Sequence, residues 1–301
     1  MRQKDYSGLS GIPHGKASEV ITPGCLVLEG GAFKGVYGEG VQDALMLSGI
    51  NLQCVIGVSA GAVNGLSYVA GDIGRPARLN LKYRHHFRYV GLYPLLRDGN
   101  AIGFSFMFKD YEREEPLDFS RLSSPGRRFV IVATDSRTGE TLYFEKEDCP
   151  DITKAVRASA AMAYLARPVK VNGHKCMDGA CSVKIPFQWA FDEGYGKVVV
   201  VHARCRGERR DESPSSLTKL FYSRRPGFAS VLDGVNARAN RDEEELERLE
   251  SEGKIFNIYP SKDLGVSHLE KDTEKLGALY WLGYNDTLEA LPALKAYLGS
   301  S

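Results

Sequence analysis

The stretch Cys54-Val55-Ile56-Gly57-Val58-Ser59-Ala60-Gly61-Ala62-Val63-Asn64 decides the fold. An apolar run precedes one serine and small residues follow it, which predicts a buried strand that turns sharply into a helix. Gly57-Val58-Ser59-Ala60-Gly61 fits G-x-S-x-G, in which a serine hydroxyl is raised above the sheet on a strained turn. A Cβ at Gly57 or Gly61 would strike neighbouring backbone, so both places take glycine. Ser59 is therefore a candidate nucleophile, and the Ala60 amide at the helix start is a candidate oxyanion donor.

The segment before this elbow has the same strand-then-helix order. Residues 25–28 read as a short buried strand, and Glu29-Gly30-Gly31-Ala32-Phe33-Lys34-Gly35 follows it. A helix is expected from Val36 to Leu47. Strand, helix, strand and helix in succession are typical of a parallel sheet with helices packed on it.

The glycine-rich loop over residues 30–35 has three possible meanings. A phosphate-binding P-loop is excluded, because Val36 and Tyr37 stand where Lys and Ser or Thr are required. A dinucleotide site would need a second glycine at Ala32 and an acidic residue ending the next strand, and neither is present. An oxyanion loop remains, since acyl transfer needs two N–H donors near the serine. We favour the amides of Gly31 and Ala32 as these donors.

Composition limits the classes of function. The chain has 301 residues with 39 Lys and Arg against 38 Asp and Glu, so its formal net charge of +1 gives no argument for nucleic acid. Its six cysteines form no C-x-x-C pair, which favours a reduced, cytoplasmic chain and predicts neither zinc nor another metal. No apolar run is long enough for a membrane span. We expect a loose leader over residues 1–22 and a single domain over residues 23–301.

The rest of the chain alternates further strands and helices. Residues 64–98 read as helix with a basic stripe, which is either a solvated face or a face for anionic lipid headgroups. The aromatic run 101–108 is either core or the lining of an acyl pocket. Strands are expected at 128–134, 141–144, 169–176, 197–202 and 255–259, and helices from Asp151 and at 227–253, 269–282 and 287–298.

A serine hydroxyl is a weak nucleophile until a neighbouring base takes its proton. The candidate histidines late in the chain are His202 and His268, and neither has an obvious acidic partner in the sequence. The alternative is a carboxylate whose pKa is raised in a dry site. Asp178 follows a strand and precedes the tight turn Gly179-Ala180, although an Asp in such a turn is commonly only structural.

The ordered set of a Gly-rich loop, G-x-S-x-G and D-G-[AG] resembles the patatin-like phospholipases, over about residues 24–300. That resemblance implies a three-layer α/β/α fold with a central, mostly parallel sheet and a Ser–Asp dyad that hydrolyses lipid acyl esters. It makes Ser59 the nucleophile and Asp178 the base, and it puts Gly30, Gly31, Ala32, Lys34 and Gly35 in the oxyanion loop. The chain departs from the family in having Ala32 for a usual Gly and Val183-Lys184 for a usual Asn-Pro.

The sequence therefore predicts a serine esterase that acts on a lipid or small ester without a cofactor. Three alternatives stay open, which are a hydrolase of short-chain esters or thioesters, a catalytically silent lipid-binding module and, in third place, a dinucleotide-binding protein. We expect a cytoplasmic protein that makes transient, peripheral contact with a membrane surface. Nothing in the sequence indicates the oligomeric state.

Overall fold

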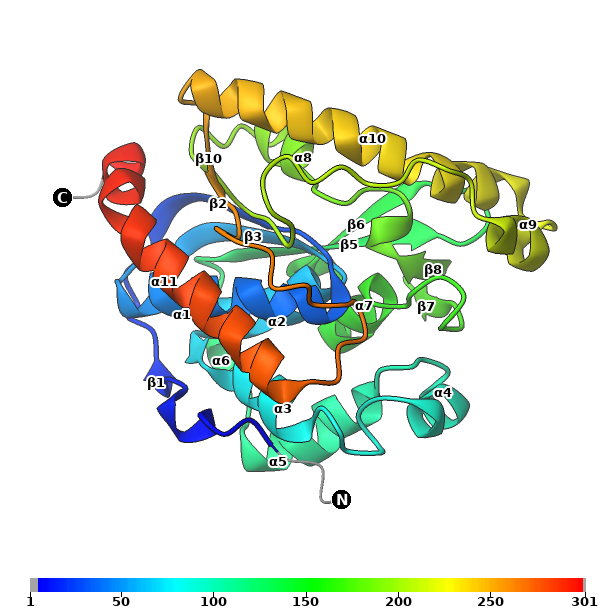
Figure 1. The fold of residues 1–301 in the computed structure, drawn as a ribbon, viewed down its shortest axis with the longest axis horizontal. Helices are drawn as coiled ribbons and strands as arrows, with labels where there is room; N and C mark the ends of the chain where they lie inside the picture. Colours follow the sequence, from blue (N-terminus) through cyan, green and yellow to red (C-terminus); the bar gives the residue numbers. More distant parts are fainter. Residues whose placement is uncertain (1–4, 300–301) are drawn as a thin grey trace.

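The computed structural model describes residues 5–299, and a mixed eight-stranded sheet lies at its centre (Figure 1). The strand order is β10-β9-β2-β3-β5-β8-β7, with β6 paired to β5. Five strands pair in parallel, namely β2 (Thr22–Leu28), β3 (Leu52–Val58), β5 (Arg128–Asp135), β9 (Val198–Val201) and β10 (Ile255–Ile258). The antiparallel additions are β6 (Thr141–Glu145), β7 (Val169–Val171) and β8 (His174–Asp178).

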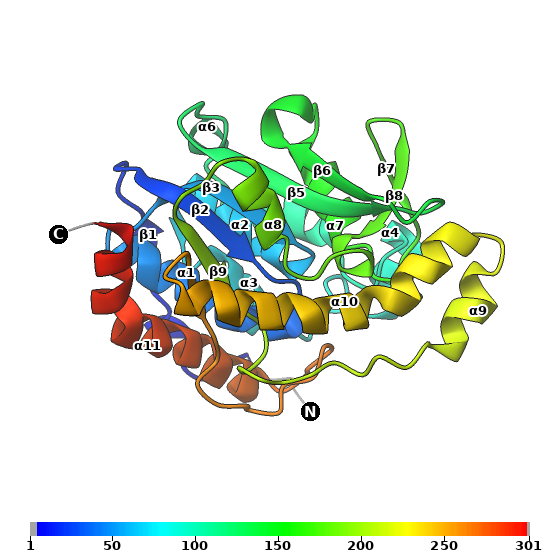
Figure 2. The same ribbon diagram turned by 90° about the horizontal axis from the view of Figure 1, so that it is seen from above.

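Helices cover both faces of this sheet. One face carries α1 (Val36–Leu47), α2 (Ala60–Ala70), α7 (Ile152–Ser159) and α11 (Thr273–Leu298), and the other carries α8 (Phe187–Asp192) and α10 (Pro226–Ser251). Seen from above, α8 and α10 lie over the sheet and the other layer lies beneath it (Figure 2). The predicted three-layer α/β/α class with a mostly parallel sheet is thus confirmed.

Alternating side chains of each central strand supply two separate cores. In β2, Leu26 and Leu28 pack with α1 and α2, whereas Cys25 and Val27 pack with apolar residues of α8 and α10. Strand residues point to opposite faces in turn, so a strand covered on both faces is apolar throughout. This is why residues 25–28 and 54–58 contain no polar side chain.

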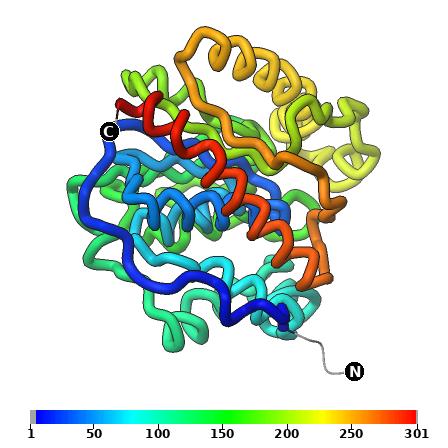
Figure 3. Tube along the Cα trace, turned by 60° about the vertical axis from the view of Figure 1, so that its left-hand side comes forward, coloured from blue at the N-terminus to red at the C-terminus, as the bar shows by residue number. Residues whose placement is uncertain are grey.

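The C-terminal helix α11 corrects our expectation of two helices at 269–282 and 287–298. It is continuous from Thr273 to Leu298 with Pro292 inside it, and it crosses α1 closely (Figure 3). A Cβ on Gly283 would lie 2.1 Å from the backbone carbonyl oxygen of Tyr37. A Cβ on Gly40 would lie 2.0 Å from the backbone carbonyl oxygen of Tyr280. Gly283, which lies in the expected gap between two helices, is therefore a contact point of two helix backbones.

The segment over residues 64–98 also differs from the single helix we expected. It contains the end of α2, strand β4 (Asp72–Ile73), α3 (Arg75–Tyr83) and α4 (Leu92–Asp98). Gly71, Gly74 and Gly91 have positive φ angles at the breaks between these elements. Gly71 ends α2 as its C-cap residue, whereas Gly74 and Gly91 precede α3 and α4 as their N-cap residues, and glycine adopts positive φ without steric penalty.

The N-terminal residues make specific contacts with the domain. Strand β1 (Gly15–Lys16) pairs with β4, and Ile12 and Ala17 are buried. Of the leader that we expected over residues 1–22, residues 1–4 lie outside the described residues. The predicted single domain over 23–301 stays a prediction, although one sheet joins strands from residues 22 to 258.

The basic stripe of α3 is occupied by ion pairs rather than available to lipid headgroups. Salt bridges join its cations to acidic residues of the segment 110–115, and the pairs are Arg75–Glu112, Arg78–Glu115, Lys82–Glu114 and Arg88–Asp110. Arg84 is buried and donates to the backbone oxygens of Leu269 and Glu270. The solvated face is found only in part, since Lys82 and Arg88 keep 42% and 37% of their side-chain surface exposed, and the ion pairs leave these cations less free for headgroups. The acidic segment includes a π-helix (Phe106–Tyr111) and α5 (Glu112–Glu114), before α6 (Phe119–Leu122).

Candidate active site

The elbow between β3 and α2 holds Ser59 in a left-handed conformation. Its φ is 54° and its ψ is −119°, and it is the N-cap residue of α2. Positive φ is uncommon in a residue with a side chain, and such strain is concentrated at functional sites. The Ser59 side chain therefore stands at the carboxyl end of β3, beside the free amides of the first turn of α2.

Glycines allow the chain to pass this closely on both sides of Ser59. A Cβ on Gly57 would lie 2.5 Å from the Gly61 oxygen, and a Cβ on Gly61 would lie 2.4 Å from the Leu28 oxygen. A Cβ on Gly30 would meet the Ser59 Cβ at 2.9 Å. The crowding inferred from G-x-S-x-G is therefore present, and it brings the end of β2 against the elbow.

Asp178 meets Ser59 although 119 residues separate them in the chain. The Ser59 hydroxyl donates to Asp178 Oδ2 at 2.7 Å, and both side chains are buried. The Ala180 amide donates to Asp178 Oδ1 at 2.8 Å, so the turn that begins at Gly179 fixes the carboxyl group. Antiparallel β8 pairs with β5 and ends at Asp178, which is how a distant acid reaches the elbow.

Burial and neighbouring groups set the pKa of Asp178. Burial raises the pKa of Asp178 to about 6, against the smaller opposite effects of the Ser59 hydroxyl, the Ala180 amide and the Lys184 charge. A carboxyl group with this pKa is ionised at neutral pH, and it is more basic than an exposed aspartate. The pair can therefore remove a proton from the serine hydroxyl without a histidine.

The Gly-rich loop lies against this pair. Ala32 begins a short 3-10 helix (Ala32–Gly35) with a φ of 48°, a left-handed value that explains why a glycine suits this position. A Cβ on Gly35 would lie 2.8 Å from the Ala60 Cβ. Among the described residues, the amides of Gly31 and Ala32 donate to no backbone oxygen. Lys34 points away from this site, because its ammonium group lies 3.8 Å from Glu208.

The two candidate histidines are placed elsewhere. Within residues 5–299 no histidine hydrogen-bonds to Ser59, and His202 Nε2 lies 3.0 Å from Asn257 Oδ1. No acidic partner of His202 was evident from the sequence, but its Nδ1 lies 3.6 Å from Glu243 Oε1, close to Glu29. The Arg210 guanidinium group pairs with both carboxylates, so it already supplies the positive charge that a metal would bring to this cluster.

Two residues near the pair escaped the sequence analysis. The Ser159 hydroxyl accepts a hydrogen bond of 2.9 Å from the Ser59 amide, and thereby holds the elbow. Lys184 places a positive charge that lowers the pKa of Asp178. The Ala-Ser-rich sequence at 158–161 hinted at close packing here, whereas Lys184 was visible only as a departure from the family pattern.

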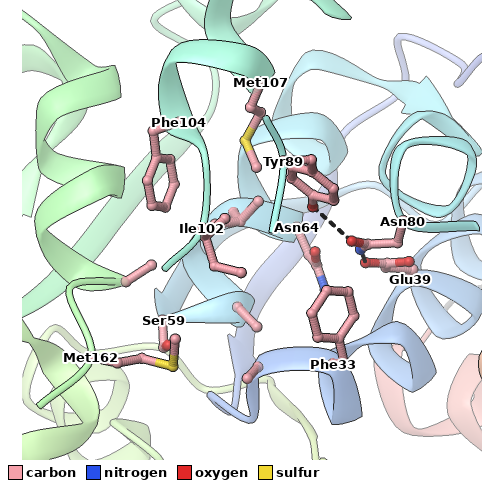
Figure 4. Close-up of a pocket in the computed structure, with 14 residues that line it drawn as sticks. Phe33, Glu39, Ser59, Asn64, Asn80, Tyr89, Ile102, Phe104, Met107 and Met162 are labelled. Carbon is pink, nitrogen blue, oxygen red and sulfur yellow. Dashed lines mark hydrogen bonds between the residues drawn. The ribbon is translucent and has the colours of Figure 1, made fainter. Parts of the chain in front are cut away.

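A cavity of about 490 Å³, open at its mouth, begins at Ser59 (Figure 4). Its apolar lining includes Phe33, Ile102, Phe104, Met107 and Met162. This apolar part of the lining suits an apolar ligand group. The aromatic run 101–108 thus contributes to the pocket and, through Phe106, to a packed cluster beside it.

Comparisons with known proteins place this geometry in a family. The model for patatin-like phospholipases matches residues 26–191, which is more than half of the chain. The chain belongs to the patatin-like phospholipase family. Membership in this family supports a hydrolase that acts on lipid, and a lipid ester is the substrate that the family implies. A domain of unknown function (DUF6363) matches residues 225–299.

Two individual proteins are similar over most of the chain. The protein YjjU of Escherichia coli (strain K12), described as uncharacterized, is 25% identical over 273 residues, which cover 86% of this chain and 74% of YjjU. The crystal structure of VipD from Legionella pneumophila has a TM-score of 0.46 and 14% identity, over 94% of this chain and 69% of that chain.

No helix among residues 5–299 is long and apolar enough to cross a bilayer.

Proposed function

We propose that this protein is a serine esterase that cleaves the acyl ester bonds of lipids through a Ser59–Asp178 dyad. The observation that carries the proposal is the 2.7 Å hydrogen bond from the Ser59 hydroxyl to the buried carboxylate of Asp178. Family membership and the apolar pocket beside Ser59 support a lipid substrate.

In the proposed reaction Ser59 Oγ attacks the ester carbonyl carbon while Asp178 takes its proton. In this scheme the amides of Gly31, Ala32 and Ala60 stabilise the oxyanion, and Ala32 and Ala60 line the same pocket as Ser59. The carbonyl re-forms as the leaving alcohol takes the proton from Asp178, which leaves an acyl group on Ser59. Asp178 then activates a water molecule that hydrolyses this acyl-enzyme and returns the proton to Ser59.

Ester turnover tests the two roles. With p-nitrophenyl butyrate and octanoate, Ser59→Ala and Asp178→Asn should each lower kcat/KM by at least about a thousandfold. Thr134→Val is a matched control, because Thr134 donates to the Asp178 backbone oxygen without touching the reacting groups. Circular dichroism verifies that each variant folds. Retained turnover in either dyad variant contradicts the role assigned to it.

A fluorophosphonate probe separates this proposal from a silent lipid-binding module. Such probes phosphonylate an activated serine, so wild-type protein should be labelled and Ser59→Ala should not. A folded wild-type protein that stays unlabelled would favour the silent module. The ratio of butyrate to octanoate turnover distinguishes a short-chain esterase from a lipid esterase. Turnover of a thioester with the same acyl chain tests for thioester hydrolysis.

We also propose that the protein meets an anionic lipid surface through one end of the molecule, here called the α4–α9 surface. It consists of α4 and its preceding loop, the segment 162–167 and α9 (Ser216–Tyr222), which share one end in both ribbon views (Figures 1 and 2). The Tyr164 ring packs 5.7 Å from that of Phe221 in α9, and the Arg167 amide donates to the oxygen of Gly99, the C-cap residue of α4, so one segment joins the two helices. Met162 of this segment lines the pocket.

Apolar and basic side chains alternate on the α4–α9 surface. Leu96 is 71% exposed and Leu220 is 72% exposed. Further exposed apolar residues are Phe87, Leu92, Tyr93, Leu217 and Phe221. Exposed Arg97, Arg167, Lys219 and Arg224 form no salt bridge with any of residues 5–299. Exposed apolar side chains that can enter a bilayer, with basic side chains on the same surface, are typical of peripheral binding to anionic lipid.

Vesicle sedimentation of the Ser59→Ala protein tests this contact without hydrolysis. Phosphatidylglycerol-containing vesicles should bind it, and pure phosphatidylcholine vesicles should bind it less. Leu96→Asp and Leu220→Asp should each weaken binding by about tenfold or more, because each removes a leucine from the apolar phase. Leu288→Asp on α11 is the control, since Leu288 is also exposed but lies outside this surface. Equal loss in all three variants contradicts the assignment.

A further inference from the structure

A buried ion pair lies directly before the glycine-rich loop. Glu29 stands between the end of β2 and Gly30, and its side chain is 2% exposed. The guanidinium group of Arg210, whose side chain is 3% exposed, donates to Glu29 Oε1 at 2.5 Å. Charged side chains are rarely buried to this extent unless they are paired. A pair this deeply buried adds little net stability to a fold, so its place beside the loop calls for another explanation.

Glu29 joins the loop to the chain that follows β9. Its amide donates to the Val201 oxygen at 3.1 Å, just beyond the parallel pairing of β2 with β9. Its second carboxylate oxygen, Oε2, accepts from the Ala203 amide at 2.6 Å. Ala203 in turn packs on the loop, since a Cβ on Gly31 would lie 2.9 Å from the Ala203 Cβ. The position of the Glu29 carboxylate therefore fixes the backbone against which Gly31 packs.

The other side of the loop is fixed by the elbow. Gly30, which follows Glu29, lies so close to the nucleophile that a Cβ on it would meet the Ser59 Cβ at 2.9 Å. The amides proposed as oxyanion donors belong to the next two residues, Gly31 and Ala32. A displacement of Glu29 would therefore move these amides relative to the Ser59 hydroxyl.

Helix α10 holds Arg210 in place. The Arg210 amide donates to Asn240 Oδ1 at 2.9 Å, and Asn240 Nδ2 donates to the Arg210 oxygen at 2.9 Å. The Arg210 guanidinium group also donates to Glu243 Oε1 at 3.4 Å. Asn240 and Glu243 both belong to α10, within residues 225–299 that DUF6363 matches. The support for Glu29 thus comes from outside residues 26–191, which the patatin-like model matches.

We infer that Arg210 is a positioning residue of the proposed reaction, which anchors Glu29 and cancels its negative charge so that the amides of Gly31 and Ala32 can bind the oxyanion. This inference rests on the proposed function, because it concerns the oxyanion that forms when Ser59 attacks an ester. An unpaired carboxylate so near the donors would repel the developing negative charge. Oxyanion donors act in the transition state, and a displacement of about 1 Å can cost about a hundredfold in rate. The ion pair should therefore affect kcat rather than substrate binding.

Single variants of Arg210 test this role. Arg210→Met should lower kcat for p-nitrophenyl octanoate by about 10- to 100-fold and change KM by less than about twofold. The rate at which a fluorophosphonate labels Ser59 should fall in parallel, because that reaction uses the same donors. Arg210→Lys keeps the positive charge but not the planar fork, so it should recover only part of the lost kcat. The pH at which activity falls on acidification should not move, since the groups that set the pKa of Asp178 are unchanged.

A double variant separates this role from a loss of stability. Glu29→Gln combined with Arg210→Met removes both charges, and the new amide oxygen can still accept from Ala203. It should therefore have a kcat about threefold or more above that of Arg210→Met alone. Arg75→Met is the matched control, because Arg75 is also buried and pairs with Glu112 at 2.8 Å, outside the pocket. It should lower Tm as Arg210→Met does, but keep kcat within about twofold of the wild-type value.

The outcomes distinguish this inference from the proposed function. If wild-type protein hydrolyses esters through Ser59 and Arg210→Met keeps its kcat, the inference is overturned and the esterase stands. A double variant no faster than Arg210→Met, or an equal loss of kcat in Arg75→Met, also overturns it. Should Arg210→Met fail to fold, Arg210→Lys decides the question, because a kcat equal to that of wild type contradicts the role. If no ester is hydrolysed and no fluorophosphonate labels Ser59, the proposed function itself fails.

Discussion

The acidity of Asp178 gives the proposed mechanism a quantitative signature. The general base must be ionised, so activity should fall as pH drops through the pKa of Asp178, which burial raises to about 6. At pH 5 roughly one carboxyl group in eleven is ionised, and kcat/KM should therefore be about tenfold below its plateau value. An aspartate at the ordinary value of 3.8 would still be about nine-tenths ionised at pH 5, and the fall would be roughly a tenth.

The assay is hydrolysis of p-nitrophenyl butyrate between pH 4.5 and 9, with the released nitrophenol read at its pH-independent wavelength. Lys184→Met should move the acid limb to higher pH, because the positive charge that lowers the pKa of Asp178 is removed. Lys175→Met is the matched control, since Lys175 is exposed three residues before Asp178. An acid limb below about pH 4.5, or one that Lys184→Met leaves in place, would refute this account of the base.

Two further substitutions probe the backbone around the elbow. Gly61→Ala should destabilise the protein by about 1–3 kcal/mol and remove activity, because the new Cβ would lie 2.4 Å from the Leu28 oxygen. Gly196→Ala, where a Cβ meets no heavy atom within 4 Å, should change neither thermal unfolding nor turnover. Ala32→Gly should keep activity and raise Tm by about 1–3 °C, because glycine adopts a φ of 48° without strain. A lower Tm for Ala32→Gly would contradict the strain assigned to this residue.

The sequence was most informative where the interactions are local. The strand, the elbow and the helix after Ser59 follow from neighbours within a few residues, and Gly57 and Gly61 reveal the crowding directly. Asp178 could be placed only with the help of the family resemblance, because its contact with Ser59 spans 119 residues. Nothing in the local pattern of Asp178-Gly179 distinguishes a base from a turn residue.

The predictions that the structure corrected concern residues whose partners lie far away in the chain. The basic stripe looked free of partners because its acidic partners lie 22 to 37 residues later, as with Arg88 and Asp110 or Arg75 and Glu112. His202 looked unpartnered for the same reason, since Glu243 lies on the distant helix α10. Two helices were expected where α11 is continuous, because tertiary packing overrides propensity where α11 crosses α1 at Gly283.

The order of strands in the sheet limits which part of the gene could be exchanged by recombination. Strand β9 lies between the two family-matched stretches in sequence, and in the sheet it stands between β2 of the first stretch and β10 of the second. A gene fragment ending at residue 191 would leave one flank of β2 with bare hydrogen-bonding groups, a template for aggregation. The C-terminal quarter therefore shares a sheet with the patatin-like part, and recombination could exchange it only together with β9, the strand that joins the two.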